Sequence, residues 1–245
     1  MLMLMRKFLL YKVRLSTYFW FFLLFYLVIT YVIPVYKSDS GTLTLFSVNS
    51  FLYGFYISPI LAMQKARIDS LHQVIRSEAN SLFDLALSLK HLAPEMRHNI
   101  LNKLNQYVIA KMKDKNINKG EKEYESLITY VINYKGKEKD EVEKVLSKIV
   151  ANQKNRTDFS MQYGNKVFSN EWHIVAVLFS ITLGFIITIN SSDIFILHLV
   201  RALLCTGLTM LIVNLIKLNT LSHKKALQMW APLKKLIDTN YYRMD

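Results

Sequence analysis

Cysteine, glycine and proline are all scarce in this chain of 245 residues, and each shortage excludes a class of protein. The single cysteine, Cys205, excludes an internal disulfide and any zinc site built from several cysteines. Only 7 glycines and 4 prolines leave little material for the glycine loops and tight turns of strand-rich folds. No HExxH, GxSxG, Walker or GxGxxG motif occurs, so we expect no enzyme, no cofactor and no metal site.

Charged residues are also missing from long stretches, although the whole chain has a formal net charge of +13 and is 52% hydrophobic. About 20 apolar residues in a helix cross the hydrocarbon core of a bilayer. Four segments fit this length, the second and fourth with some polar residues: residues 15–36, 44–64, 172–192 and 194–216. The sequence therefore predicts an all-α membrane protein, with four transmembrane helices in two hairpins that flank a cytoplasmic helical bundle.

The positions of the basic residues predict the orientation of these spans. Of the 31 Lys and Arg residues, only Lys37 lies in a predicted outer loop and only Arg201 lies within a span. Both termini are therefore expected in the cytoplasm, with the chain in the inner (plasma) membrane. Anionic lipid explains the positive charge, so no nucleic-acid partner is expected. The predicted regions are an N-terminal membrane hairpin (1–64), a cytoplasmic helical region (65–171), a C-terminal membrane hairpin (172–217) and a basic tail (218–245).

The cytoplasmic region begins with a heptad seam that is typical of a coiled coil. Its apolar positions are Ile68, Leu71, Ile75, Leu82, Leu85, Leu89 and Leu92. Glu78 interrupts this seam. It either reaches past the edge of a bundle into water, or is buried and bonded to a neighbouring helix or subunit with help from Arg76 or Asn80.

The same periodicity predicts the remaining helices of this region. The first helix continues from the second span and ends before Pro94, which opens the next helix at Pro94–Lys113. A loop at residues 114–120 and two more helices follow. Residues 152–170 are polar, and a helix leading back to the membrane is one interpretation of them.

Two groups of polar residues within the spans are candidates for an ion path. Arg201 either snorkels towards the outer surface or lines an anion path together with His198, one turn earlier on the same helix face. Asp193 is a candidate counter-ion. The other groups available to line a path are Asn49, Ser50, Gly54 and Ser58.

One stretch of the chain carries a family pattern: an Arg-rich start of a long helix, a Glu-Ala-Asn element, and a Pro-led helix that reaches a Tyr. The matching residues are Ala66, Arg67, Arg76, Ser77, Glu78, Ala79, Asn80, Leu92, Ala93, Pro94 and Tyr107. With two spans before this stretch and two after it, the chain resembles the DUF4239 family of bacterial membrane proteins, also called bestrophin-like. The resemblance implies an ion channel and brings no catalytic residues.

The function expected from these features is that of a homo-oligomeric, channel-like protein of the lipid bilayer that conducts ions, with anions favoured. The alternative is a non-conducting membrane adaptor or sensor, whose cytoplasmic bundle binds a protein partner in a stress or anti-phage response. The polar residues of the second span favour a pore, whereas the large bundle favours an adaptor.

Overall fold

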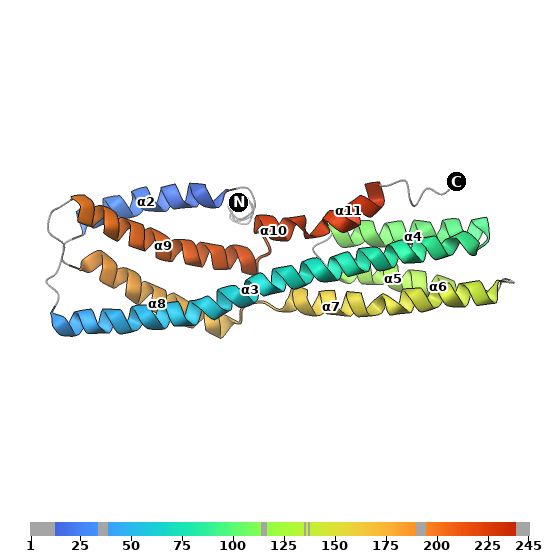
Figure 1. Ribbon diagram of the computed structural model, residues 1–245, viewed down its shortest axis with the longest axis horizontal. Coiled ribbons are helices and arrows are strands. Elements are labelled where there is room, and N and C mark those ends of the chain that lie inside the picture. The colour runs from blue at the N-terminus through green and yellow to red at the C-terminus, as the bar shows by residue number, and fades with distance from the viewer. Residues whose placement is uncertain are drawn as a thin grey trace. The chain divides into compact units, whose positions relative to one another are not determined.

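The computed structural model describes residues 13–33, 39–113, 117–134, 136, 138–189 and 195–238, and every element in this part of the chain is helical (Figure 1). The helices are α2 (Leu15–Val32), α3 (Ser40–Ser88), η1 (Leu89–His91), α4 (Pro94–Lys113), α5 (Ile117–Ile132), α6 (Lys139–Ala151), α7 (Gln153–Gly164), α8 (Ser169–Thr188), α9 (Phe195–Asn219), α10 (Lys224–Leu227), η2 (Gln228–Trp230) and α11 (Ala231–Asp238). The predicted all-α class is confirmed.

The chain divides into two compact units. Unit 1 comprises Met1–Ile68 and Lys166–Ala226, and unit 2 comprises Asp69–Asn165 and Leu227–Asp245. Four helical segments are long and apolar enough to cross a membrane, as predicted: Leu15–Val32, Ser40–His91, Lys139–Thr188 and Phe195–Asp238. Their apolar parts fall in α2, α3, α8 and α9, which build unit 1.

In unit 1, α9 lies between α2 and α8 (Figure 1). The α2 helix therefore packs against a helix from the far end of the sequence, a pairing that the sequence did not predict. A buried hydrogen bond joins the two helices, with 2.8 Å between the Tyr26 hydroxyl and Thr209 Oγ1. The α3 helix packs against α8 and α9 through Tyr53 and Ile57, whose side chains are buried beside Val175. Many other apolar side chains of these helices are exposed, as expected for surfaces that face lipid.

The α3 helix is continuous from the apolar segment into unit 2, as predicted. Asp39 caps its start, because Oδ1 accepts a hydrogen bond of 2.8 Å from the Thr42 backbone N–H. Pro59 lies inside the helix, a position that membrane helices tolerate when neighbours compensate for the missing backbone bond. The helix ends before Pro94, which occupies the first turn of α4 as predicted.

Unit 2 is a bundle formed by the last part of α3 together with α4, α5, α6, α7 and α11, in which α4 packs on α5 and α11, and α6 packs on α5 and α7. Its heptad seam positions are buried, as the spacing predicts: Leu71, Ile75, Leu82, Leu85, Leu89 and Leu92. The side chains of α4 to α6 that complete the core include Ile100, Leu104, Leu127, Val145 and Ile149.

The structure corrects the sequence prediction at one place and adds detail at two others. Residues 117–120, predicted as part of a loop, are the first turn of α5, whereas 114–116 lie outside the described residues. The helix that was one interpretation of residues 152–170 is present as α7. Within residues 218–245, predicted as a basic tail, the described residues after α9 include α10, η2 and α11, and α11 contacts α4. Met229 and Leu233 are buried there, because an apolar pair four residues apart lies on one helix face.

The helix at the predicted third span begins earlier than expected. The α8 helix runs from Ser169 to Thr188, and the backbone of Ile189, with a φ of −59° and a ψ of 134°, does not continue it. The turn predicted at residues 190–193, including the candidate counter-ion Asp193, lies outside the described residues.

Candidate functional site

The candidate path residues of α3 lie on different faces of that helix. Gly54 and Ser58 are exposed, so unit 1 does not cover them. Asn49 instead turns towards α8, where Nδ2 donates hydrogen bonds to Thr182 Oγ1 at 2.7 Å and to the Leu178 carbonyl at 3.2 Å. An amide that joins two apolar helices in this way holds them together. The structure therefore places Asn49 in a helix–helix contact and leaves Gly54 and Ser58 on an open face.

Ser50, the fourth candidate on α3, is half-buried. Its Oγ atom is buried and has no hydrogen-bond partner among the described residues. A buried hydroxyl without a partner costs free energy, and a bound water or a residue of another subunit would relieve that cost.

Arg201 is buried, with an exposed fraction of 6%, and its guanidinium points at the end of α8. Nε donates to the Ile186 carbonyl at 3.0 Å, and Nη2 donates to the Ile187 carbonyl. The last four carbonyls of a helix have no partner within that helix, and the helix dipole makes this end negative. Arg201 is therefore a side-chain cap for α8, a role that the sequence did not predict.

His198 lies near the same end of unit 1, also 6% exposed. Its ring stacks on Tyr31 of α2, with 4.3 Å between ring centroids and 13° between ring planes. Its Nδ1 is buried without a hydrogen-bond partner among the described residues. His198 and Arg201 thus share one helix face as predicted, but each contacts a different neighbouring helix.

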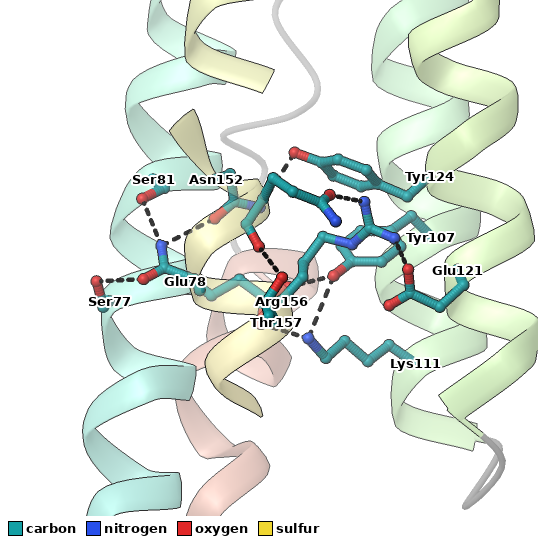
Figure 2. A network of polar contacts seen from close by, with 12 residues as sticks. Ser77, Glu78, Ser81, Tyr107, Lys111, Glu121, Tyr124, Asn152, Arg156 and Thr157 are labelled. Atoms are coloured by element: carbon teal, nitrogen blue, oxygen red, sulfur yellow. Dashed lines mark hydrogen bonds and ion pairs between the residues drawn. The ribbon is translucent and has the colours of Figure 1, made fainter. Parts of the chain in front are cut away.

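A second candidate site is the charged network in the core of unit 2 (Figure 2). Glu78 has no exposed surface, and its carboxylate accepts hydrogen bonds from the Tyr107 hydroxyl and the Lys111 ammonium, both on α4. Of the two interpretations of Glu78, the structure shows the buried one, with its partners in the same chain. Arg76 and Asn80, proposed to assist it, are exposed. At 100° per residue, each lies about 200° around the helix from Glu78.

A second ion pair completes this network. Arg156 of α7 is 2% exposed, and its guanidinium donates to Glu121 of α5 and to Gln153 Oε1, the latter at 2.6 Å. The guanidinium carbon lies 3.8 Å from the centroid of the Tyr124 ring, a cation–π contact. Asn152 donates to the Tyr124 hydroxyl at 3.2 Å, and that hydroxyl donates to the Ile149 carbonyl at 2.7 Å.

Burial controls the titration of this network. It raises the pKa of Tyr107 well above its usual value, assisted by the charge of Glu78, and it raises the pKa of Tyr124 to about 12. Burial also lowers the pKa of Lys111, while the Glu78 carboxylate acts in the opposite direction. Two acids and two bases balance each other, because a buried charge without a partner is costly. No three His, Cys, Asp or Glu side chains in the described ranges lie close enough to hold a metal ion.

A family model, the Bestrophin-like domain, matches residues 16–223 and so spans most of the chain. The chain belongs to the bestrophin-like family. This confirms the resemblance predicted from the sequence, and the bestrophin-like family is a family of channel-like membrane proteins. No curated protein and no solved structure matches the chain.

Two residues of the bestrophin-like sequence pattern belong to the charged network of unit 2. The Glu-Ala-Asn element contributes Glu78, and the Tyr that the Pro-led helix α4 reaches is Tyr107, its hydrogen-bond partner. Lys111 lies one turn beyond Tyr107 on α4 and was not singled out from the sequence, since a lysine in a basic helix looks like any solvated lysine. The spacing of Lys111 from Tyr107 was the signal that could have found it.

Proposed function

We propose that this bestrophin-like chain assembles as a homo-oligomer in the membrane and conducts ions, with anions favoured, along a path lined by α3 of each subunit. The observation that carries the proposal is the open face of α3, where small and polar residues stand uncovered beside two exposed phenylalanines. Thr44, Ser47, Gly54 and Ser58 lie on this face together with Phe51 and Phe55, whose ring centroids are 6.0 Å apart.

Small and polar residues gain little from contact with lipid tails, so this face is better suited to contact other subunits or water. Thr44 and Ser47 donate their hydroxyl hydrogens to the carbonyls of Ser40 and Leu43, both at 2.9 Å. Their oxygen lone pairs stay available to water on this face. The preference for anions is supported by the net charge of +13, which attracts anions to the mouth of a path.

The proposal is tested by adding bulk to this face. We expect Gly54→Leu to reduce chloride flux into liposomes to near the background of protein-free vesicles, because a leucine narrows the path in every subunit. Gly184→Leu on α8 is the matched control, since a Cβ at either glycine meets no atom within 4 Å. Equal loss of flux in both variants would contradict a path along α3.

A wild-type protein that passes no ions under any ionic condition would end the proposal of conduction. That result would favour the alternative, in which unit 2 binds a protein partner and the helices of unit 1 serve as an anchor.

The proposed orientation, with both termini and unit 2 in the cytoplasm, has its own test. Ser40 and Lys122 are exposed, and native Cys205 is fully buried, so a single introduced cysteine dominates the labelling. We expect an impermeant maleimide to modify Ser40→Cys in intact cells and Lys122→Cys only after lysis. Labelling of Lys122→Cys in intact cells would contradict the proposed orientation, because it would place unit 2 outside the cell.

A further inference from the structure

Five basic side chains gather at one end of unit 1, and the network and the proposed path use none of them. We call this set the basic end, and it consists of Lys65, Arg67, Lys217, His223 and Lys225. Three parts of the chain contribute: the α3 helix, the last turn of α9, and the segment that comprises the turn after α9 and the start of α10.

Two members of the basic end are buried and held by hydrogen bonds. Arg67 is 3% exposed and donates to Gln64 Oε1 at 3.0 Å and to the Asn219 carbonyl at 3.3 Å. Lys217 is 5% exposed, and its ammonium donates to the Val13 carbonyl at 2.6 Å. These bonds bring the middle of α3, the end of α9 and the backbone just before α2 to one place.

The turn after α9 has a fixed backbone. The Ser222 N–H donates to the Lys217 carbonyl at 2.9 Å, and Leu221 has a φ of 53°. A residue with such left-handed backbone angles often ends a helix, and it is usually glycine. The same backbone conformation in a leucine costs about 1 kcal/mol of conformational free energy. Leu221 is 9% exposed, so burial of its side chain offsets the strain. The fixed turn positions His223, whose Nδ1 accepts from the Lys225 backbone N–H at 3.3 Å.

The charges of the basic end are close enough to repel one another. Burial, and then the positive charges of Lys217, Lys225 and Lys65, lower the pKa of His223. No Asp or Glu occurs in the sequence between Asp193 and Asp238. An anion bound among them would therefore lower the electrostatic energy of unit 1.

The location of the basic end indicates which kind of anion binds there. The basic end lies where the apolar stretch of α9 finishes and where α2 begins, the level at which lipid headgroups meet membrane helices. Lys65 and Lys225 are exposed and His223 is half-buried, so a headgroup can reach them above the buried Arg67 and Lys217.

We propose that the basic end binds the phosphate group of an anionic phospholipid. The exposed rim of Lys65, His223 and Lys225 contacts the phosphate, and the buried charges beneath strengthen the attraction. The binding of lipid does not depend on ion conduction, so a test of one proposal does not decide the other.

Native mass spectrometry of the full chain in detergent tests this proposal by measuring retained lipid. We expect the wild type to retain phosphatidylglycerol in preference to phosphatidylcholine. The variant Lys65→Gln/His223→Gln/Lys225→Gln should weaken phosphatidylglycerol retention about tenfold to thirtyfold, since each lysine near a membrane surface contributes a few-fold. The matched control is Lys122→Gln/Lys234→Gln, which removes two exposed lysine charges from unit 2 and should leave retention unchanged.

Three outcomes would overturn the proposal. Equal weakening in the triple variant and in the control would show that net charge alone attracts the lipid. Equal retention of phosphatidylglycerol and phosphatidylcholine by the wild type, a measurement that needs no variant, would exclude a site for anionic lipid. Retention of inorganic phosphate at millimolar concentration without a preference for phosphatidylglycerol would assign the site to a free anion.

Discussion

Replacing Glu78 with glutamine is expected to lower the free energy of unfolding of unit 2 by about 3–5 kcal/mol, the usual cost of removing one partner from a buried ion pair. Glu78 has no exposed surface and is the acceptor for both Tyr107 and Lys111. Glutamine keeps the shape of the side chain and removes the charge, which leaves the Lys111 ammonium buried beside a neutral amide. Because both partners lie in the same chain, the expected loss is in folding and not in subunit association.

The loss should depend on pH, and its sign follows from Lys111. Burial lowers the pKa of Lys111 in the folded chain, and Glu78 opposes that shift, so the substitution lowers the pKa further. Between this pKa and that of an unfolded lysine, about 10.4, the unfolded chain binds more protons than the folded chain. Stability therefore rises with pH in this window, and the deficit of Glu78→Gln should shrink as the pH rises towards the pKa of the unfolded lysine.

Trp230 offers a local signal for this measurement. It lies in unit 2, where its ring centroid is 5.7 Å from that of Phe159, and the other tryptophans, Trp20 and Trp172, lie in unit 1. Fluorescence during urea unfolding, with Trp20 and Trp172 replaced by phenylalanine, then reports on unit 2 of the full chain.

Two variants serve as controls for Glu78→Gln. Glu125→Gln removes an exposed carboxylate from the same unit and should change stability by less than about 0.5 kcal/mol. The double variant Glu78→Gln/Lys111→Met removes both charges and should recover much of the loss, because no unpaired charge remains buried. If the double variant is less stable than Glu78→Gln alone, the ion pair is not the source of the effect.

Replacing Arg201 with glutamine is expected to destabilise unit 1 by about 2–4 kcal/mol, since two hydrogen bonds from a charged donor are lost at the end of α8. Arg201→Lys should be almost as harmful, although it keeps the positive charge. A lysine ammonium lacks the planar fork that lets Arg201 donate from Nε and Nη2 to the neighbouring carbonyls of Ile186 and Ile187. The midpoint of thermal unfolding of the protein in detergent measures both variants.

The same two variants separate a cap from an anion path. Under a chloride gradient, a path in which Arg201 attracts anions by charge alone should keep its reversal potential in Arg201→Lys and lose it in Arg201→Gln. If Arg201 is a cap, both Arg201→Lys and Arg201→Gln should lower the stability of unit 1. Any ion flux that remains in these variants should keep its selectivity. Normal stability in both variants, combined with altered selectivity in Arg201→Gln only, would contradict the role as a cap.

The spacing of apolar residues in the sequence predicted part of the charged network of unit 2. Hydrophobic spacing of seven residues placed Glu78 on an apolar seam, because a helix brings such positions to one face, but it left open whether the carboxylate is buried or reaches water. It could not identify Tyr107 and Lys111 as the partners, since their contact joins two helices whose relative rotation depends on how both pack. For the same reason, Asn49 was predicted as a path residue, but its amide contacts α8 through Thr182.

The sequence by itself determined that this is a helical membrane protein, because uncharged stretches, basic flanks and heptad spacing are local properties that survive any arrangement of the helices. Its Glu-Ala-Asn element and Pro-led helix carried the resemblance to the bestrophin-like family, which the family model then confirmed. Only the tertiary structure decided what the charges inside the protein do. The acceptors of Arg201 are carbonyls that become available only where α8 ends, and no pattern in the sequence marks Thr188 as that end. The partners of Glu78 and the convergence of the basic end likewise depend on contacts between helices distant in sequence, which packing of the whole chain selects.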